Sequence, residues 1–191
     1  ENGLMINGDA GTGKSYVIKN VYKYFTDKKI GVAKLCFTNK GALNIGGQTI
    51  HKFLGLDDKG RVSQKKIDTI KQFFKLIIID EVSMVSSFLW KRLYELKKIG
   101  LKFLLVGDWK QIPPVEPNMK DYDYMEHPSV ITMSNNKLIV LETIHRYDIK
   151  LKKASMEVMK LKTNNYGNKI CKKNICYMNK TRKYVNKLVN D

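Results

Sequence analysis

An eight-residue loop near the amino end constrains this chain more than any other part of it. Residues 8–15 read Gly-Asp-Ala-Gly-Thr-Gly-Lys-Ser and match the pattern G-x-x-x-x-G-K-[ST] at every fixed position. A short apolar run at residues 4–6 precedes the loop, and apolar residues at helical spacing follow it over residues 17–25. Further apolar runs alternate with helical patterns downstream, which predicts an α/β fold with a parallel sheet flanked by helices.

The loop predicts a site for a nucleoside triphosphate. The backbone N–H groups of a glycine-rich loop can wrap a phosphate, and the helix that follows points its positive end at the same anion. In this pattern Lys14 reaches the β- and γ-phosphates, and the hydroxyl of Ser15 binds Mg²⁺. We therefore expect ATP and Mg²⁺ as cofactors. The residues expected to bind the nucleotide are Gly8, Asp9, Ala10, Gly11, Thr12, Gly13, Lys14 and Ser15.

Two acids close the most apolar run of the chain. Residues 76–79 read Leu-Ile-Ile-Ile and are followed by Asp80 and Glu81. Such a run suits a central parallel strand, and ligands of open α/β sheets gather at the carboxyl ends of the strands. We expect Asp80 to hold Mg²⁺ and Glu81 to orient and deprotonate the attacking water. Solvated acids that open a helix are the alternative, and the upstream loop makes it the weaker one.

A third apolar run, at residues 103–106, is also followed by polar residues. Among them, Gln111 is a candidate sensor of the γ-phosphate, because an amide can donate to a phosphate and accept from water. Gln111 can equally be an ordinary loop residue, and its chemistry alone does not choose between the two.

Five segments, in this order along the chain, resemble motifs of superfamily 1 DNA helicases of the RecD-like and Pif-type branch. The segments that resemble motifs I, Ia with its following segment, II, III and IV are residues 8–15, 37–53, 80–84, 107–115 and 141–146. The wording Asp-Glu-Val-Ser-Met in motif II and Lys-Gln-x-Pro-Pro-Val in motif III separates this branch from the UvrD-like one.

This resemblance implies a P-loop NTPase with a RecA-like sheet, followed by the start of a second RecA-like domain. It implies an ATP-dependent DNA helicase core that uses ATP and Mg²⁺ to move along single-stranded DNA, 5′ to 3′. It also implies that Arg146 is an arginine finger for the γ-phosphate. The residues implied to contact DNA are Thr38, Asn39, Lys40, Thr49 and His51.

Prolines and polar segments suggest the domain boundaries. We expect a first RecA-like domain at residues 1–120, with a small insertion at about 55–75, and a loop-like linker at 121–137. The apolar run at 138–141 is then the first strand of an incomplete second RecA-like domain, 138–191. Motifs V and VI are not found in the chain, so we do not expect the isolated chain to be a competent helicase.

The composition agrees with a polyanionic partner. Lys and Arg number 35 against 18 Asp and Glu, a net charge of +17, although an AT-rich source also favours such a composition. No apolar run is long enough to span a membrane, and three scattered cysteines favour an intracellular protein. The nucleus, the mitochondrion, a prokaryotic cytoplasm and a viral replication site remain open, with replication or repair proteins as partners. A nucleotide- and nucleic-acid-binding fragment without turnover and a P-loop ATPase acting on RNA are the alternatives.

Overall fold

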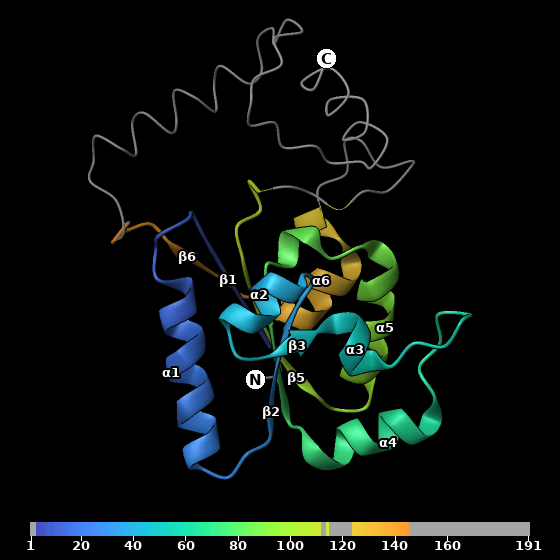
Figure 1. Ribbon diagram of the computed structural model, residues 1–191. Helices are drawn as coiled ribbons and strands as arrows, with labels where there is room; N and C mark the ends of the chain where they lie inside the picture. Colours follow the sequence, from blue (N-terminus) through green and yellow to red (C-terminus); the bar gives the residue numbers. More distant parts are fainter. Residues whose placement is uncertain (1–2, 112–113, 115–123, 146–191) are drawn as a thin grey trace, which may run out of the picture. The chain divides into compact units, whose positions relative to one another are not determined.

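Six parallel strands form one sheet in the computed structural model, which describes residues 3–111, residue 114 and residues 124–145 (Figure 1). In the order in which they lie side by side, the strands are β3 (Gln48–Thr49), β2 (Val32–Cys36), β4 (Leu76–Asp80), β5 (Lys102–Gly107), β1 (Gly3–Gly8) and β6 (Leu138–Leu141). Because every pairing is parallel, the carboxyl ends of all the strands lie at one edge of the sheet. The predicted α/β class is confirmed.

Helices cover both faces of this sheet. The helix α1 lies on one face, whereas α3, α5 and α6 lie on the other (Figure 1). Among the described residues, none of the helices has the length and apolar character to cross a membrane. The helices are α1 (Lys14–Asp27), α2 (Asn39–Asn44), α3 (Ile50–Leu54), α4 (Gln64–Phe73), α5 (Ser87–Lys98) and α6 (Pro128–Ser134), with short 3₁₀ turns η1 (Val82–Met84) and η2 (Tyr124–Glu126).

The strand β4 is buried on both faces, which explains its continuous apolar sequence. Ile78 packs in the cluster that includes Ile18 of α1, whereas Ile77 and Ile79 pack in the cluster on the other face, which includes Trp90 of α5. Burying an isoleucine side chain stabilises a fold by about 1.5–3 kcal/mol, so this strand anchors both layers. The acids that follow it are therefore held on a rigid element.

Four helices begin with a Ser or Thr cap, and α1 does not. Thr38, Thr49, Ser63 and Ser86 each accept a hydrogen bond from the backbone N–H three residues later. Gly13, which precedes α1, has a φ of 91° and supplies no side-chain cap. The first turn of α1 therefore keeps backbone donors that no side-chain cap satisfies, as an anion-binding helix requires.

The run at 138–141 corrects the expected domain boundary. We expected it to open a second domain, but the structure places it as β6, paired in parallel with β1, with Ile139 opposite Ile6. The N–H of Met5 also donates to the carbonyl of Lys137 at 2.8 Å. The strand therefore belongs to the first compact unit, which runs over Glu1–Arg146. An apolar run of this length carries no sign of which sheet it joins, because its partner lies far away in sequence.

The expected linker at 121–137 is also corrected, because it contains the helix α6. This helix packs against α5, β1 and β5, and a Cβ on Gly3 of β1 would overlap the carbonyl of Met133. Its segment is rich in β-branched residues and has Pro128 at its start, so its local pattern does not read as a helix. The segment at 55–75 likewise contributes α4, whose Ile70 is fully buried in the core. The expected second domain beyond residue 145 lies outside the described residues.

Candidate nucleotide site

The P-loop adopts a tight path between β1 and α1 that its glycines permit. Gly11 and Gly13 have φ angles of 87° and 91°, in the left-handed region that side chains rarely adopt. A Cβ on Gly8 would lie 2.6 Å from Oγ1 of Thr12, so a larger residue does not fit there. Thr12 in turn donates its hydroxyl to the carbonyl of Asp9 at 2.8 Å. The loop geometry thus depends on the residues that the motif specifies.

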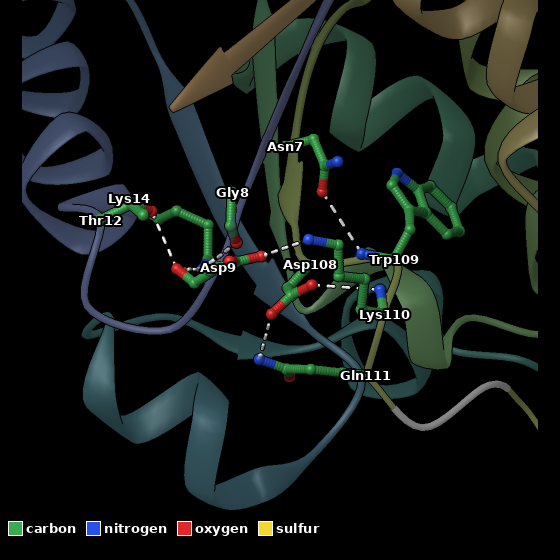
Figure 2. Close-up of polar contacts among 9 residues, drawn as sticks. All are labelled: Asn7, Gly8, Asp9, Thr12, Lys14, Asp108, Trp109, Lys110 and Gln111. Carbon is green, nitrogen blue, oxygen red and sulfur yellow. Dashed lines mark hydrogen bonds and ion pairs between the residues drawn. The ribbon is translucent and has the colours of Figure 1, made fainter. Parts of the chain in front are cut away.

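Lys14 is held by the loop that it follows. Its ammonium donates to the carbonyl oxygens of Gly8, at 2.6 Å, and Asp9, at 2.8 Å (Figure 2). Burial lowers the pKa of Lys14 from its usual value, and the nearby carboxylates of Asp108, Asp80 and Asp9 partly oppose this change. The ammonium therefore lies among acceptors and negative charges. A bound phosphate would compete with these groups for the hydrogen bonds of the ammonium.

A cavity of about 540 Å³ lies over the P-loop, a volume within the usual range for small-molecule sites. It brings together residues of motifs that lie as far apart in the sequence as residues 10 and 145. The residues that line it are Ala10, Gly11, Gly13, Lys14, Ser15, Tyr16, Asp80, Glu81, Gly107, Asp108, Gln111 and His145.

The position of β5 explains this convergence. It lies between β1, which leads into the P-loop, and β4, which leads into the two acids. In the register of the sheet, Ile6 faces Val106, and Ile79 faces Leu105. The loop after β5 therefore starts between the P-loop and Asp80, so Gln111 reaches the same cavity.

Asp80 has the donor chemistry expected for a Mg²⁺ site. Its pKa is raised mainly by burial and also by the charge of Glu81, while the N–H of Glu81 donates to Oδ1 of Asp80 at 2.9 Å and opposes the shift. A nearby cation would favour the charged carboxylate in this buried position. Asp80 and the hydroxyl of Ser15 both line the cavity and offer oxygen ligands.

These two residues fit Mg²⁺ only together with other ligands. Within the part of the chain that the structure describes, no group of three or more His, Cys, Asp or Glu side chains is placed to hold a metal. Mg²⁺ is commonly held by one or two protein groups together with the phosphates of a nucleotide and water. The residues present therefore fit a metal that arrives with the nucleotide.

Glu81 stands in an unusual backbone conformation immediately after β4. Its φ of 54° and ψ of 43° are in the left-handed region, which is uncommon for a residue with a side chain. Its Oε2 accepts hydrogen bonds from the hydroxyl of Thr38 and from the thiol of Cys36, both at 3.1 Å. Strained conformations of this kind persist when the surroundings over-determine them, and they cluster at active sites.

Cys36 is a residue of the site that sequence reasoning missed. The sequence gives it no role of its own, whereas in the sheet it pairs in register with Asp80. Burial raises its pKa to about 12, and the hydrogen bond to Glu81 adds to this effect. The predicted parallel sheet could have indicated Cys36. It is the last residue of β2, which lies beside β4, and so it lies next to the acids at the end of β4.

The loop after β5 is held by a bond of its own and by contacts with the P-loop and with β1 (Figure 2). The amide of Gln111 donates to Oδ2 of Asp108 at 3.2 Å, and Nζ of Lys110 lies 3.0 Å from Oδ1 of Asp9. The backbone N–H of Trp109 donates to Oδ1 of Asn7 at 3.3 Å. The indole of Trp109 packs against the core.

The residues expected to contact DNA lie at the same edge of the sheet. Thr38 and Thr49 follow or end the neighbouring strands β2 and β3, and each caps a short helix. Asn39 and Lys40 are exposed in α2, and the exposed ring of His51 lies 5.9 Å from the ring of Phe37. The structure brings them together at one edge, and their contact with DNA stays a prediction.

Arg146 lies outside the described residues, but its neighbour His145 is described. The backbone N–H of His145 donates to the carbonyl of Gly11 at 2.9 Å, and the side chain lines the cavity. His145 was named only as part of a motif, without a role of its own. The end of the described chain is therefore attached to the P-loop.

Comparison with known proteins agrees with this site. The protein family described as "AAA domain" matches residues 1–117. The "ATP-dependent DNA helicase PIF1" of Candida albicans is 37% identical over 131 residues, which cover 59% of this chain and 14% of that protein. The "ATP-dependent DNA helicase Pif1" of Campylobacter jejuni is 35% identical over 136 residues, which cover 62% of this chain and 30% of that protein.

A solved structure gives the same result for the fold. The crystal structure of Pif1 helicase from Candida albicans matches with a TM-score of 0.65 and 27% identity over 87% of this chain and 42% of that chain. The resemblance to Pif-type superfamily 1 helicases that the motifs indicated is thereby confirmed. The chain spans less than a third of the length of the two relatives above.

Proposed function

The chain belongs to the AAA domain family, and from this premise we propose that it is the ATP-binding and ATP-hydrolysing part of a DNA helicase. One observation supports this most strongly. Lys14, Ser15, Asp80, Glu81 and Gln111 come from three separate segments of the chain and line one cavity over the P-loop. Phosphoryl transfer needs little more from a protein than positioned charges, a metal site and a group that orients the attacking water.

Each residue has one role in this proposal. The P-loop backbone and Lys14 bind the β- and γ-phosphates, and Ser15 and Asp80 hold Mg²⁺, which neutralises charge on the phosphates when it is bound. Glu81 orients the attacking water and takes its proton. Gln111 contacts the γ-phosphate from the loop after β5.

The remaining roles follow from similarity to Pif-type helicases. Arg146 supplies positive charge to the γ-phosphate in the transition state. Single-stranded DNA binds along Thr38, Asn39, Lys40, Thr49 and His51, and movement runs 5′ to 3′. The relatives are named DNA helicases, which favours DNA over RNA and supports a role in replication, repair or recombination.

A second function fits the limited span of the chain. The chain covers 14% and 30% of the two relatives described above, so most of the sequence of those proteins lies outside the matched region. The alternative is a module that binds a nucleotide and nucleic acid without turnover. A third function is an ATPase that acts on RNA. Comparing single-stranded DNA with RNA in the same assay distinguishes it from the other two.

Phosphate release from ATP, with and without single-stranded DNA, tests the proposal. We expect Mg²⁺-dependent release that DNA stimulates, and we expect Lys14→Ala and Arg146→Ala to abolish it. Lys19→Ala is a matched control, because Lys19 is an exposed lysine of the same helix, α1. Nucleotide and DNA binding without phosphate release would favour the second function, and equal stimulation by RNA would favour the third.

A further inference from the structure

Lysines gather at the amino ends of three neighbouring strands, on the edge of the sheet opposite to the nucleotide cavity. They lie where α1 leads to β2, where α4 leads to β4 and where α5 leads to β5 (Figure 1). The segments 27–31, 71–75 and 97–102 contain seven lysines, of which six are exposed, against a single acid, Asp27. We call this surface the basic edge, and its exposed lysines are Lys28, Lys29, Lys71, Lys75, Lys98 and Lys102.

The parallel sheet brings these three connections side by side. The strand β4 lies between β2 and β5, and Val32, Leu76 and Lys102 are in register. The backbone N–H of Lys75 donates to the carbonyl of Gly31 at 2.9 Å, and the N–H of Lys102 donates to the carbonyl of Lys75 at 3.0 Å. Neighbouring strands are about 4.8 Å apart, so the lysines share one continuous surface about 10 Å wide at the backbone.

The positive charge of the basic edge is not neutralised by acids. Within the part of the chain that the structure describes, none of its six lysines forms an ion pair. Nζ of Lys28 donates to the hydroxyl of Tyr24 at 2.6 Å, and Nζ of Lys75 donates to the carbonyl of Lys71 at 3.3 Å. These partners are neutral, so the charge of the lysines remains available to an anion.

Helix stability does not explain all of these lysines. The negative carboxyl end of a helix attracts cations, which accounts for Lys71 and Lys98. It does not account for Lys102, which begins the strand β5. Lys29 has a φ of 58°, in the left-handed region, at a position after a helix where glycine is common. A lysine is therefore present where the backbone conformation favours another residue.

Two exposed aromatic rings lie beside the lysines. The side chains of Tyr24 and Phe73 are 55% and 60% exposed. Nζ of Lys28 lies 4.2 Å from the centroid of the Tyr24 ring, and the carbonyl of Phe73 lies so close to Gly31 that a Cβ there would overlap it. Proteins that bind single-stranded nucleic acid combine a positive surface with aromatic side chains on which bases stack. In a duplex the faces of the bases are covered, so the exposed rings favour a single strand.

We propose that the basic edge is a second binding site for single-stranded DNA, in which the lysines contact phosphates and Tyr24 and Phe73 stack on bases. The strand β5 spans six residues, so about 20 Å separates this edge from the loops around the nucleotide cavity. The site is therefore distinct from the DNA contacts proposed at the carboxyl ends of the strands. It goes beyond the proposed function and does not depend on ATP hydrolysis.

Titration of the chain with oligo(dT) of about eight nucleotides, a length within the range of single-strand sites, counts the sites. A variant that combines Lys29→Gly, Lys75→Gln and Lys102→Gln should bind one oligonucleotide fewer per chain than wild type. Glycine adopts the backbone conformation of residue 29 without strain, so this variant should remain folded, which circular dichroism checks. If the DNA contacts at the carboxyl ends are absent, the number should fall from one to none, so the two proposals fail separately.

A matched control removes the same charge from other parts of the surface. Lys19→Gln, Lys59→Gln and Lys91→Gln together replace three exposed lysines outside the basic edge, and this variant should bind as many oligonucleotides as wild type. Equal loss in both variants would show that net charge alone attracts the DNA, and would overturn the inference. Tighter binding of duplex DNA, RNA or polyglutamate than of oligo(dT) at the basic edge would also overturn it.

A fluorescent residue at the basic edge reports binding there directly. Phe73→Trp places an indole at an exposed position, and saturating oligo(dT) should quench the added emission as bases stack on it. In this background the logarithm of the affinity should fall linearly with the logarithm of the salt concentration, and Lys75→Gln should reduce the slope by about 0.7, the value for one phosphate contact. Added emission that DNA leaves unchanged would overturn the inference.

Discussion

Nζ of Lys110 lies 3.0 Å from Oδ1 of Asp9, so the loop after β5 is paired with the P-loop directly beside Gln111. The hydrogen bond and the charge of Asp9 raise the pKa of Lys110, so its ammonium is charged at neutral pH. Both side chains are exposed, at 71% and 36%, and such a pair adds at most about 1 kcal/mol to stability. Its importance therefore lies in the charge that it presents to a bound triphosphate.

Removing Lys110 should weaken nucleotide binding. Lys110→Ala leaves the carboxylate of Asp9 unpaired beside the phosphates, so we expect the Kd for a fluorescent ATP analogue to rise several-fold. Asp9→Ala combined with Lys110→Ala should return close to the wild-type Kd, because the unpaired charge is gone. The effect should shrink as salt is raised, since exposed charges are screened. A double variant as weak as Lys110→Ala alone would contradict this account.

Glu81→Gln should separate binding from hydrolysis. The amide keeps the size of the side chain but cannot take a proton from water, so we expect kcat to fall by about 10²–10⁴. The Kd for ATP should stay within a factor of two or so of wild type, because the P-loop and Lys14 are untouched. Stopped assays of phosphate release beside titration with a fluorescent ATP analogue give the two values. Equal loss of binding would show that Glu81 supports the loop instead.

Replacing Asp80 by Asn should stabilise the protein at neutral pH. The folded-state pKa of Asp80 is raised above the usual 3.8, mainly by burial, so stability falls as the pH rises above the usual pKa, and the full cost is reached above the raised pKa. The cost is absent below the usual pKa, where the side chain is protonated in both states. Asn keeps the acceptor for the N–H of Glu81, so the gain should be seen at pH 7 and disappear as the pH falls through this window.

Urea unfolding at several pH values measures the effect of Asp80→Asn. Asp58→Asn, on an exposed turn, serves as the control for a lost surface charge. A variant that is less stable than wild type at pH 7 would show that attraction to Lys14 outweighs the burial of the carboxylate. Mg²⁺-dependent phosphate release should be lost in Asp80→Asn in either case.

Gly41→Ala should destabilise the protein, and Cys36→Ala should relieve much of the loss. A Cβ at residue 41 would overlap Sγ of Cys36, whereas alanine in an open helix position would gain about 1 kcal/mol. The double variant removes the sulfur and makes room, so we expect a favourable coupling of about 0.5–3 kcal/mol between the two sites. Urea unfolding of both single variants and the double variant measures it. Strictly additive effects would show that the overlap is relieved elsewhere.

Much of the nucleotide site was predictable because its signals are local. The pattern at residues 8–15 specifies glycines for a strained loop and a helix that follows, and the structure has the positive φ angles of Gly11 and Gly13 that this pattern requires. The three apolar runs that precede the polar loops became β1, β4 and β5. A parallel sheet then brings their carboxyl ends to one edge, so Asp80, Glu81 and Gln111 were expected near the loop.

The tertiary structure decided which strands are neighbours and which side chains meet. The apolar run that became β6 joins the first sheet beside β1, and the segment that became α6 is a helix because it packs on α5 and β1. The contacts of Glu81 with Cys36 and of Asp9 with Lys110 join residues 45 and 101 positions apart. Local pattern determined the kind of element that the apolar runs form, but for α6 packing decided even this. Burial against distant partners determined where each element lies, and no property of a segment itself records that choice.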